Sequence, residues 1–139
     1  MKSFFHRLLA LFLIALAPSS GAVELIVHPN IEQAGLPRST VRSIFTMRMT
    51  SWPNGQPVRV FVLGDKDDLH AMFSKHILGV FPHQLRRAWN RQIFSGTGQA
   101  PEKVADQKEM LDRVTQTPGA IGYISEEMIN EQIRTIAVE

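Results

Sequence analysis

The sequence contains no cysteine, which excludes two features at once. A chain without cysteine forms no disulfide, even in an oxidising compartment, and carries no lipid on an amino-terminal cysteine. Apolar runs are short as well, because the run from Leu8 to Ala17 falls well below the roughly 20 residues that a membrane-spanning helix needs. These absences favour a free, soluble protein with neither a disulfide nor a lipid anchor.

The amino-terminal region has the three parts of a secretory signal peptide. Lys2 and Arg7 are followed by the apolar run, and then by a break of small residues that ends in the Ser-x-Ala pattern of Ser20 and Ala22. This pattern predicts cleavage after Ala22, with residues 1–22 as the signal peptide and residues 23–139 as the mature domain. The expected location is a bacterial periplasm, and the alternative for the same segment is a membrane anchor.

The predicted cleavage changes the charge of the chain. The whole sequence has 15 Lys and Arg against 13 Asp and Glu, and loss of Lys2 and Arg7 would leave the two signs equal. A near-neutral mature protein gives no electrostatic reason to expect a nucleic-acid partner. Its length is that of one domain with a single core.

Short strands alternate with helices along the predicted mature domain. Apolar runs indicate strands, and apolar residues spaced three and four apart indicate helices between them. We expect Ser39 or Thr40 to cap the first helix and Pro82 to open the third. The expected strands cover residues 25–27, 58–63, 120–124 and 133–138, and the expected helices start near residues 37, 65–67, 82 and 106. The order predicts an α/β fold, a single three-layer-like domain with a small mixed sheet flanked by helices.

The third predicted helix combines basic and aromatic residues. Its apolar stripe, Leu85, Trp89 and Ile93, is expected to face the core, with Arg86, Arg87 and Arg91 largely outward. Such a cluster is found in nucleic-acid and anion sites. The spacing separates the Trp from much of the charge, so we interpret it as a solvated helix face.

Patterns of catalytic or metal-binding residues are scarce. No zinc-type spacing and no Gly-x-Ser-x-Gly motif occurs, and the Gly-rich stretch 94–101 lacks the Gly-Lys-Ser/Thr of a phosphate-binding P-loop. Asp67 and His70 could share a metal ion, but a helix cap beside an exposed His is the favoured interpretation. We therefore predict a non-enzymatic protein with no metal and no cofactor.

Four stretches resemble a known family. They are Val41–Phe45, Trp52–Gly55, Ala88–Arg91 with the following Phe94–Gly96, and, most specifically, the joint Thr117–Tyr123. In their order along the chain and in their residues, these stretches resemble the phosphate substrate-binding proteins of ABC transporters. More narrowly, they resemble short exported relatives that keep about one lobe of the type 2 periplasmic binding protein fold. The resemblance covers roughly residues 36–124.

The resemblance implies where an anion would bind. In the full-length family two lobes close over phosphate, and one side of the site is an Arg at a strand end followed by a Ser-Gly-Thr loop that opens a helix. On this chain the Ser-Gly-Thr positions fall on Asp67, Asp68 and Leu69, and the Arg position falls on Leu63. Carboxylates at a helix start satisfy the dipole themselves and repel a phosphate. Phosphate binding by the usual route of the family is therefore not expected.

Two functions remain open at this point. In the first, the domain binds a small anionic or polar solute through two loops. The candidate residues are Lys66, Asp67, Asp68, Ser95, Gly96 and Thr97. In the second, the domain is an interaction or regulatory module that contacts a periplasmic or membrane protein and binds no small solute.

Overall fold

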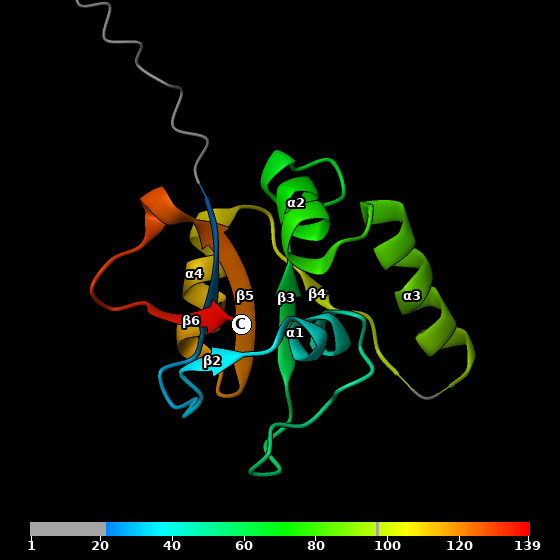
Figure 1. Ribbon diagram of the computed structural model, residues 1–139, viewed down its shortest axis with the longest axis horizontal. Helices are drawn as coiled ribbons and strands as arrows, with labels where there is room; N and C mark the ends of the chain where they lie inside the picture. The colour runs from blue at the N-terminus through cyan, green and yellow to red at the C-terminus, as the bar shows by residue number, and fades with distance from the viewer. Residues whose placement is uncertain (1–21, 97) are drawn as a thin grey trace, which may run out of the picture.

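The computed structural model describes residues 22–96 and 98–139, which form one α/β unit (Figure 1). The predicted signal peptide lies outside the described residues, apart from Ala22. The strands are β1 Val23–Val27, β2 Gly35–Leu36, β3 Arg59–Val62, β4 Glu102–Lys103, β5 Ala120–Ser125 and β6 Arg134–Val138. The helices are α1 Arg38–Phe45, α2 Asp68–Met72, the π-helix η1 Phe73–Leu78, α3 Pro82–Phe94, α4 Gln107–Gln116 and the 3₁₀ turn η2 Glu126–Met128.

The described strands form one mixed sheet in the order β2-β6-β1-β5-β3-β4. β1 lies antiparallel between β5 and β6, whereas β3 runs parallel to β5 and β4. The four strands expected from the sequence are confirmed. The two-residue strands β2 and β4 were not predicted, because they are too short to carry an alternating pattern.

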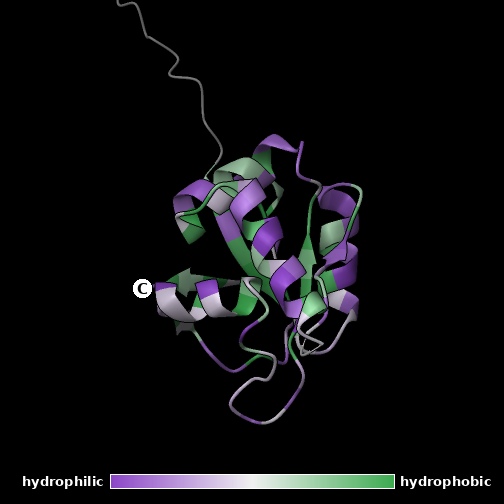
Figure 2. Cartoon of the chain, turned by 90° about the vertical axis from the view of Figure 1, so that its right-hand side faces the viewer, coloured by the Kyte–Doolittle hydropathy of each residue, from purple (hydrophilic) through white to green (hydrophobic). Residues whose placement is uncertain are grey.

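Helices cover both faces of the sheet, because two consecutive residues of β5 contact helices on opposite sides of it. Gly122 faces α4 so closely that an added Cβ atom would lie 2.5 Å from Met110 Sδ. The next residue, Tyr123, points to the opposite face and stacks on Phe73 of η1, with ring centroids 3.9 Å apart. The predicted three-layer arrangement is confirmed, and Figure 2 shows the hydrophobic strands between the helical layers.

Helix α1 differs from the prediction at its start and has an unusual end. Its N-cap is Pro37, with no side-chain cap hydrogen bond, so the expectation of a Ser39 or Thr40 cap is wrong. At the other end, Met47 adopts a left-handed conformation (φ 65°), and Arg48 N–H donates to the Ser43 carbonyl at 2.9 Å. This is a Schellman turn with methionine where glycine is usual, and it turns the chain sharply at Arg48.

The second helix begins as predicted but continues differently. Asp67 caps α2, and Gly79 ends the helical segment in a left-handed conformation (φ 72°). Between Asp67 and Gly79 the α-helix continues as the wider π-helix η1, whose hydrogen bonds span one more residue. The spacing of the apolar residues does not indicate this change. The buried Ser74 hydroxyl donates to the Val80 carbonyl at 2.6 Å and stabilises this widened end.

Helix α3 packs through a narrower stripe than the sequence suggests. Leu85 and Trp89 are buried as predicted, but Ile93 is 43% exposed because the carboxyl end of α3 extends past the core. Helix α4 begins at the predicted cap, where the Asp106 carboxylate accepts from Glu109 N–H at 2.8 Å. Within the described part of the chain, no helix is both long and apolar enough to cross a membrane.

Candidate functional site

The loop that follows β3 carries the first group of predicted site residues. The chain leaves the sheet at Leu63 and enters α2 at Asp68 (Figure 1). Asp67 Oδ1 accepts hydrogen bonds from Leu69 N–H at 2.8 Å and from His70 N–H at 3.4 Å. These are the amide groups that a helix start offers to an anion, and here the protein's own carboxylate occupies them.

The other charged groups of this loop are arranged around the same point. Asp65 forms an ion pair with Arg86 of α3. Lys66 and Asp68 are exposed, and Asp68 is the acidic residue in the first turn of α2. The predicted residues Lys66, Asp67 and Asp68 thus lie together in one loop. With Asp65, this loop carries three carboxylates and one lysine.

A buried polar chain lies directly below this loop. The Tyr123 hydroxyl accepts a hydrogen bond from Leu63 N–H at 2.9 Å and is hydrogen-bonded to His70 Nδ1. Most hydrogen-bonding groups are satisfied when the Tyr123 hydroxyl donates to His70 Nδ1 and the neutral imidazole carries its proton on Nε2. His70 Nε2 lies 3.9 Å from Asp65 Oδ1 and has no hydrogen-bond partner among the described residues. The expectation of an exposed His70 is wrong, since this side chain is fully buried.

Burial determines the protonation of both rings. It lowers the pKa of His70 below its usual 6.5, against the opposing effect of Asp65 and Asp67, and Lys103 lowers it further. Burial likewise raises the pKa of Tyr123 well above its ordinary value. A general acid or base must reach its substrate, and neither ring is exposed. The chain Asp65–His70–Tyr123 therefore fits a structural role rather than a catalytic one.

The lowered pKa of His70 predicts a loss of stability in mild acid. Below about pH 6.5 the unfolded chain binds a proton at His70 that the folded chain resists, so the free energy of unfolding should fall as the pH drops. Urea unfolding between pH 7.5 and about 5 measures this slope. The His70→Asn variant keeps a group at the Nδ1 position and should flatten the slope, whereas His76→Asn, which removes an exposed imidazole, should retain it. An unchanged slope in His70→Asn would contradict this account.

The second predicted loop lies elsewhere. Ser95 and Gly96 follow the last turn of α3, while the first loop contacts α3 at Arg86. Nine residues of helix separate these points, which is about 13 Å along the axis. Figure 1 shows the loop after β3 leading into α2, and the loop after α3 at the end of that helix that lies far from α2. Thr97 lies outside the described residues. The structure thus does not bring the two predicted loops together, and ligand binding at either stays a prediction.

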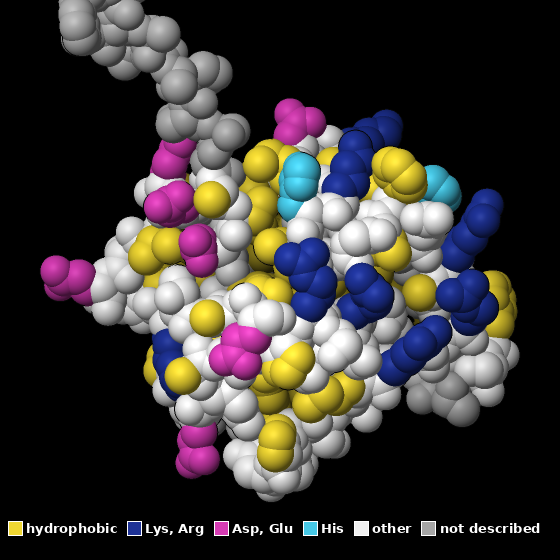
Figure 3. Space-filling model, in the orientation of Figure 1, with side chains coloured by type: hydrophobic (Ala, Val, Ile, Leu, Met, Phe, Trp, Pro, Cys, Tyr) yellow, Lys and Arg dark blue, Asp and Glu magenta, His cyan; other side chains and the backbone are white. Residues whose placement is uncertain are grey.

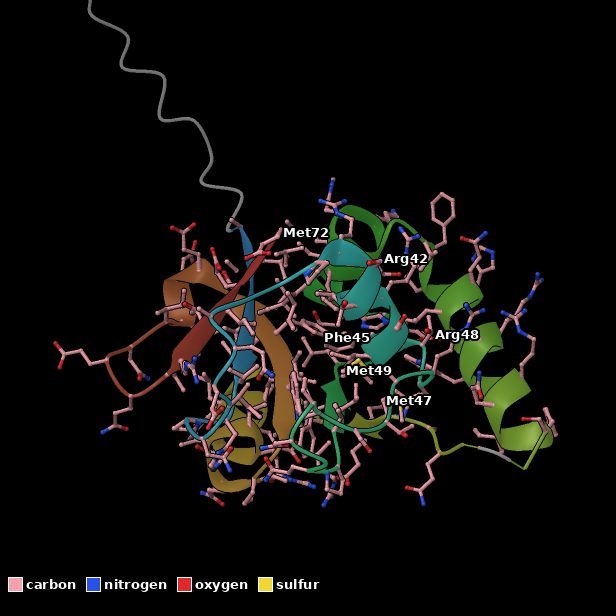
Figure 4. All side chains as sticks on the ribbon, turned by 60° about the horizontal axis from the view of Figure 1, so that its bottom comes forward. Arg42, Phe45, Met47, Arg48, Met49 and Met72 are labelled. Carbon is pink, nitrogen blue, oxygen red and sulfur yellow. The ribbon has the colours of Figure 1, made fainter. Side chains whose placement is uncertain are left out.

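Another group of polar residues lines a hollow of about 370 Å³ between α1 and α3. Its basic residues are Arg42, Arg48, Arg87 and Arg91, and we call the surface between them the arginine groove. Figure 4 shows Arg42 and Arg48 on the α1 side of this groove. The arginines of α3 were predictable from the sequence, but the groove was not. A usable signal was the lack of any Asp or Glu over residues 33–64 and 69–101.

The closeness of Asp67 and His70 raises the question of a metal site. Within the described ranges, no group of three or more His, Cys, Asp or Glu side chains has a suitable arrangement. The Asp67 carboxylate is engaged as a helix cap, and His70 is directed toward Tyr123. These contacts explain the closeness of Asp67 and His70 without a metal.

Comparison with known families places the chain. The family model described as the PBP superfamily domain matches residues 20–138. The chain belongs to the PBP superfamily. Comparison with curated proteins finds no match. The resemblance noted in the sequence is thus confirmed at the level of the family.

Solved structures with the same fold as this PBP domain include two proteins of ABC-type phosphate transport and a PstS protein. An ABC-type phosphate transport receptor from Vibrio cholerae aligns with a TM-score of 0.65 and 15% identity, covering 84% of this chain and 45% of that one. A phosphate ABC transporter substrate-binding protein with bound phosphate from Clostridium perfringens aligns at 0.67 and 19%, covering 86% and 46%. PstS from Borrelia burgdorferi aligns at 0.67 and 16%, covering 86% and 47%.

These alignments show a shared fold over part of the larger proteins. The PBP domain described here spans less than half the length of each of these three structures. At identities of 15–19%, the likeness carries the fold of a phosphate-receptor lobe and leaves the ligand open. The binding properties of this chain therefore depend on its own residues.

Proposed function

We propose that this chain is an exported, non-catalytic PBP domain that acts through contact with another protein and does not capture phosphate at the usual position of the family. The single observation that carries the proposal is the double acceptance by Asp67. Its carboxylate takes the amide groups of Leu69 and His70, the donors that an anion would need at the start of α2.

The surrounding charges support the same conclusion. If the resemblance to phosphate-binding proteins holds at this loop, the Ser-Gly-Thr positions of that family correspond to Asp67–Leu69 and its Arg to Leu63. Leu63 is buried at 1% exposure and supplies no donor side chain. The guanidinium nearest to the loop, that of Arg86, is already paired with Asp65. A phosphate placed there would meet the carboxylates of Asp67 and Asp68 with Lys66 as the one lysine of the loop, at a cost of about 1 kcal/mol per close like-charge pair in water.

The lobe architecture adds a second argument. Small-molecule sites usually form where two lobes meet and enclose most of the ligand surface. The described residues form one lobe, so the loop at Asp67 offers one wall of such a site. Export rests on the sequence pattern of residues 1–22, and the non-catalytic role on the fold family and on the sealed His70–Tyr123 pair.

Isothermal titration calorimetry tests the loss of phosphate capture. The wild-type domain should give no binding heat with millimolar phosphate. The variant Asp67→Ser/Asp68→Gly restores a hydroxyl and removes two like charges, so its phosphate affinity should rise about tenfold or more. The matched control Asp106→Ser/Asp112→Ser removes two charges on the other side of the sheet, at the start and middle of α4, and should bind no better than wild type.

Two results would contradict the proposal. Micromolar phosphate binding by the wild-type domain would show that the loop accepts an anion despite its carboxylates. Equal gains in the two double variants would show that overall charge, and not the position of Asp67 and Asp68, governs the affinity. The first of these results would make solute binding through Lys66, Asp67 and Asp68 the favoured function.

A further inference from the structure

The arginine groove lies on a different part of the molecule from the Asp67 loop. Its walls are the side of α1 and the turn after it, which carry Arg42 and Arg48, and the facing side of α3, which carries Arg87 and Arg91. The left-handed Met47 turn sets the direction in which the chain leaves α1 at Arg48. Met47 is held in a conformation that is unfavourable for a residue other than glycine, and this conformation determines where Arg48 lies. Strain of this kind is common at binding sites, so the position of Arg48 supports a binding role for the groove.

The four guanidinium groups have no acidic partners. Across residues 22–96 and 98–139, the ion pairs involve Arg59, Arg86 and Arg113, and none involves an arginine of the groove. Among the described residues, the Arg42 guanidinium is the one of the four with a hydrogen bond to the protein, from Nε to the Leu78 carbonyl at 3.0 Å, which fixes its stem at the end of η1. The groove therefore presents four positive charges that the protein itself does not neutralise.

Charge is distributed unevenly over the whole domain. Residues 33–101 contain nine Lys and Arg against three Asp, whereas residues 22–32 and 102–139 contain four against ten Asp and Glu. Figure 3 shows the basic side chains gathered over α1 and α3 and the acidic ones toward the opposite side. A domain that is near neutral overall thus has one strongly basic face, which steers an acidic partner toward it.

The shape and floor of the groove select an extended, partly apolar ligand. Val80, Leu85 and Ala88 line it between the arginines. Val80 and Gln84 also border a second hollow of about 450 Å³, where Lys75 lies over the ring of Phe81, which is 52% exposed. The two adjoining hollows together are longer than one small oxyanion. Their apolar floor offers an oxyanion neither a hydrogen-bond donor nor a positive charge.

We infer that the arginine groove binds an acidic peptide segment of a partner protein, one that has glutamate or aspartate beside aliphatic side chains. This inference rests on the proposed function, because it gives that function a surface and a partner chemistry. Carboxylates of the segment pair with the guanidinium groups, bidentately where the geometry allows, and its aliphatic residues contact the groove floor. A membrane is the less suitable ligand, since the charges surround a hollow rather than a flat plane.

Fluorescence anisotropy with a labelled glutamate- and leucine-containing peptide tests the inference on the full mature domain. We expect micromolar affinity that weakens as salt rises, and no binding of the same peptide with glutamine in place of glutamate. The charge-reversal variant Arg87→Glu/Arg91→Glu should weaken binding about tenfold or more. The control Lys103→Glu/Lys108→Glu has the same change of net charge at exposed positions outside the groove and should bind as wild type does.

Other outcomes would overturn the inference. An equal loss of peptide affinity in both charge-reversal variants would show that binding depends on the overall charge and not on the groove. Full displacement of the peptide by millimolar phosphate would indicate an oxyanion site, and binding of phosphatidylglycerol vesicles in preference to the peptide would indicate a membrane surface. Circular dichroism of each variant shows whether it is folded, and Arg87→Gln/Arg91→Gln provides a milder second variant. Phosphate binding that Arg87→Glu/Arg91→Glu leaves intact would refute the proposed function but not the groove.

Discussion

Replacing Tyr123 with phenylalanine is expected to lower the free energy of unfolding by about 3 kcal/mol, although only one oxygen atom is lost. The hydroxyl is the hydrogen-bond partner of both Leu63 N–H and His70 Nδ1, and each of these groups is buried. A buried polar group that loses its partner costs about 1–3 kcal/mol. The ring stacking on Phe73 is retained in the variant, so the loss reports the hydroxyl alone.

A double-mutant cycle separates this network from simple packing. Urea unfolding of Tyr123→Phe, His70→Phe and the double variant gives the three free energies needed. The double variant should cost less than the two single variants together, because it removes both polar partners and leaves only Leu63 N–H unpaired. Strict additivity would mean that Tyr123 and His70 do not act as a pair.

Replacing Gly119 with alanine should destabilise the domain by at least about 3 kcal/mol. Gly119 has a φ of 77°, and an added Cβ atom would lie 2.3 Å from the Pro57 carbonyl oxygen. A left-handed conformation costs a non-glycine residue about 1–2 kcal/mol, and the contact with a backbone atom forces a further shift. That shift would strain two bonds to the Gly119 carbonyl, from Arg59 N–H at 3.0 Å and from the Trp52 indole at 2.9 Å.

Two other glycines provide matched controls for this effect. Gly55 also has a positive φ, 88°, but nothing lies within 4 Å of an added Cβ atom, so Gly55→Ala should show the conformational cost alone. Gly64 has open space and no positive φ, so Gly64→Ala should change stability little. Thermal and urea unfolding should rank Gly119→Ala as the most destabilising and Gly64→Ala as the least. Equal values for Gly119 and Gly55 would show that the contact with Pro57 is relieved without cost.

The Pro118–Gly119 joint illustrates what local patterns can predict. Pro118 stops α4, the positive φ of Gly119 completes the turn, and β5 begins at Ala120. The Asp67 and Asp106 caps and the buried strand at Val60 to Val62 were predictable for the same reason. In each case the residues that determine the geometry are neighbours in the chain.

The candidate surfaces were less predictable because they depend on distant residues. His70 and Tyr123 are 53 positions apart, and their pairing reversed the expectation of an exposed imidazole. The arginine groove joins α1 and the turn after it to α3, and its arginines on the two sides lie 39 to 49 positions apart in the sequence. The loops at Lys66 and Ser95, which the sequence suggested as one site, lie apart along α3, because the first contacts this helix at Arg86 and the second follows its last turn.

The sequence by itself determined the α/β class, most element boundaries and the membership in a family of binding-protein lobes, because apolar periodicity, caps and turn residues act over short distances. Only the tertiary structure decided that the Asp67 carboxylate fills its own helix start, that a histidine is buried beneath it, and that four arginines without an ion pair to any described residue surround one groove. Those outcomes depend on which faces meet when the helices pack on the sheet, and short-range patterns carry no record of that choice.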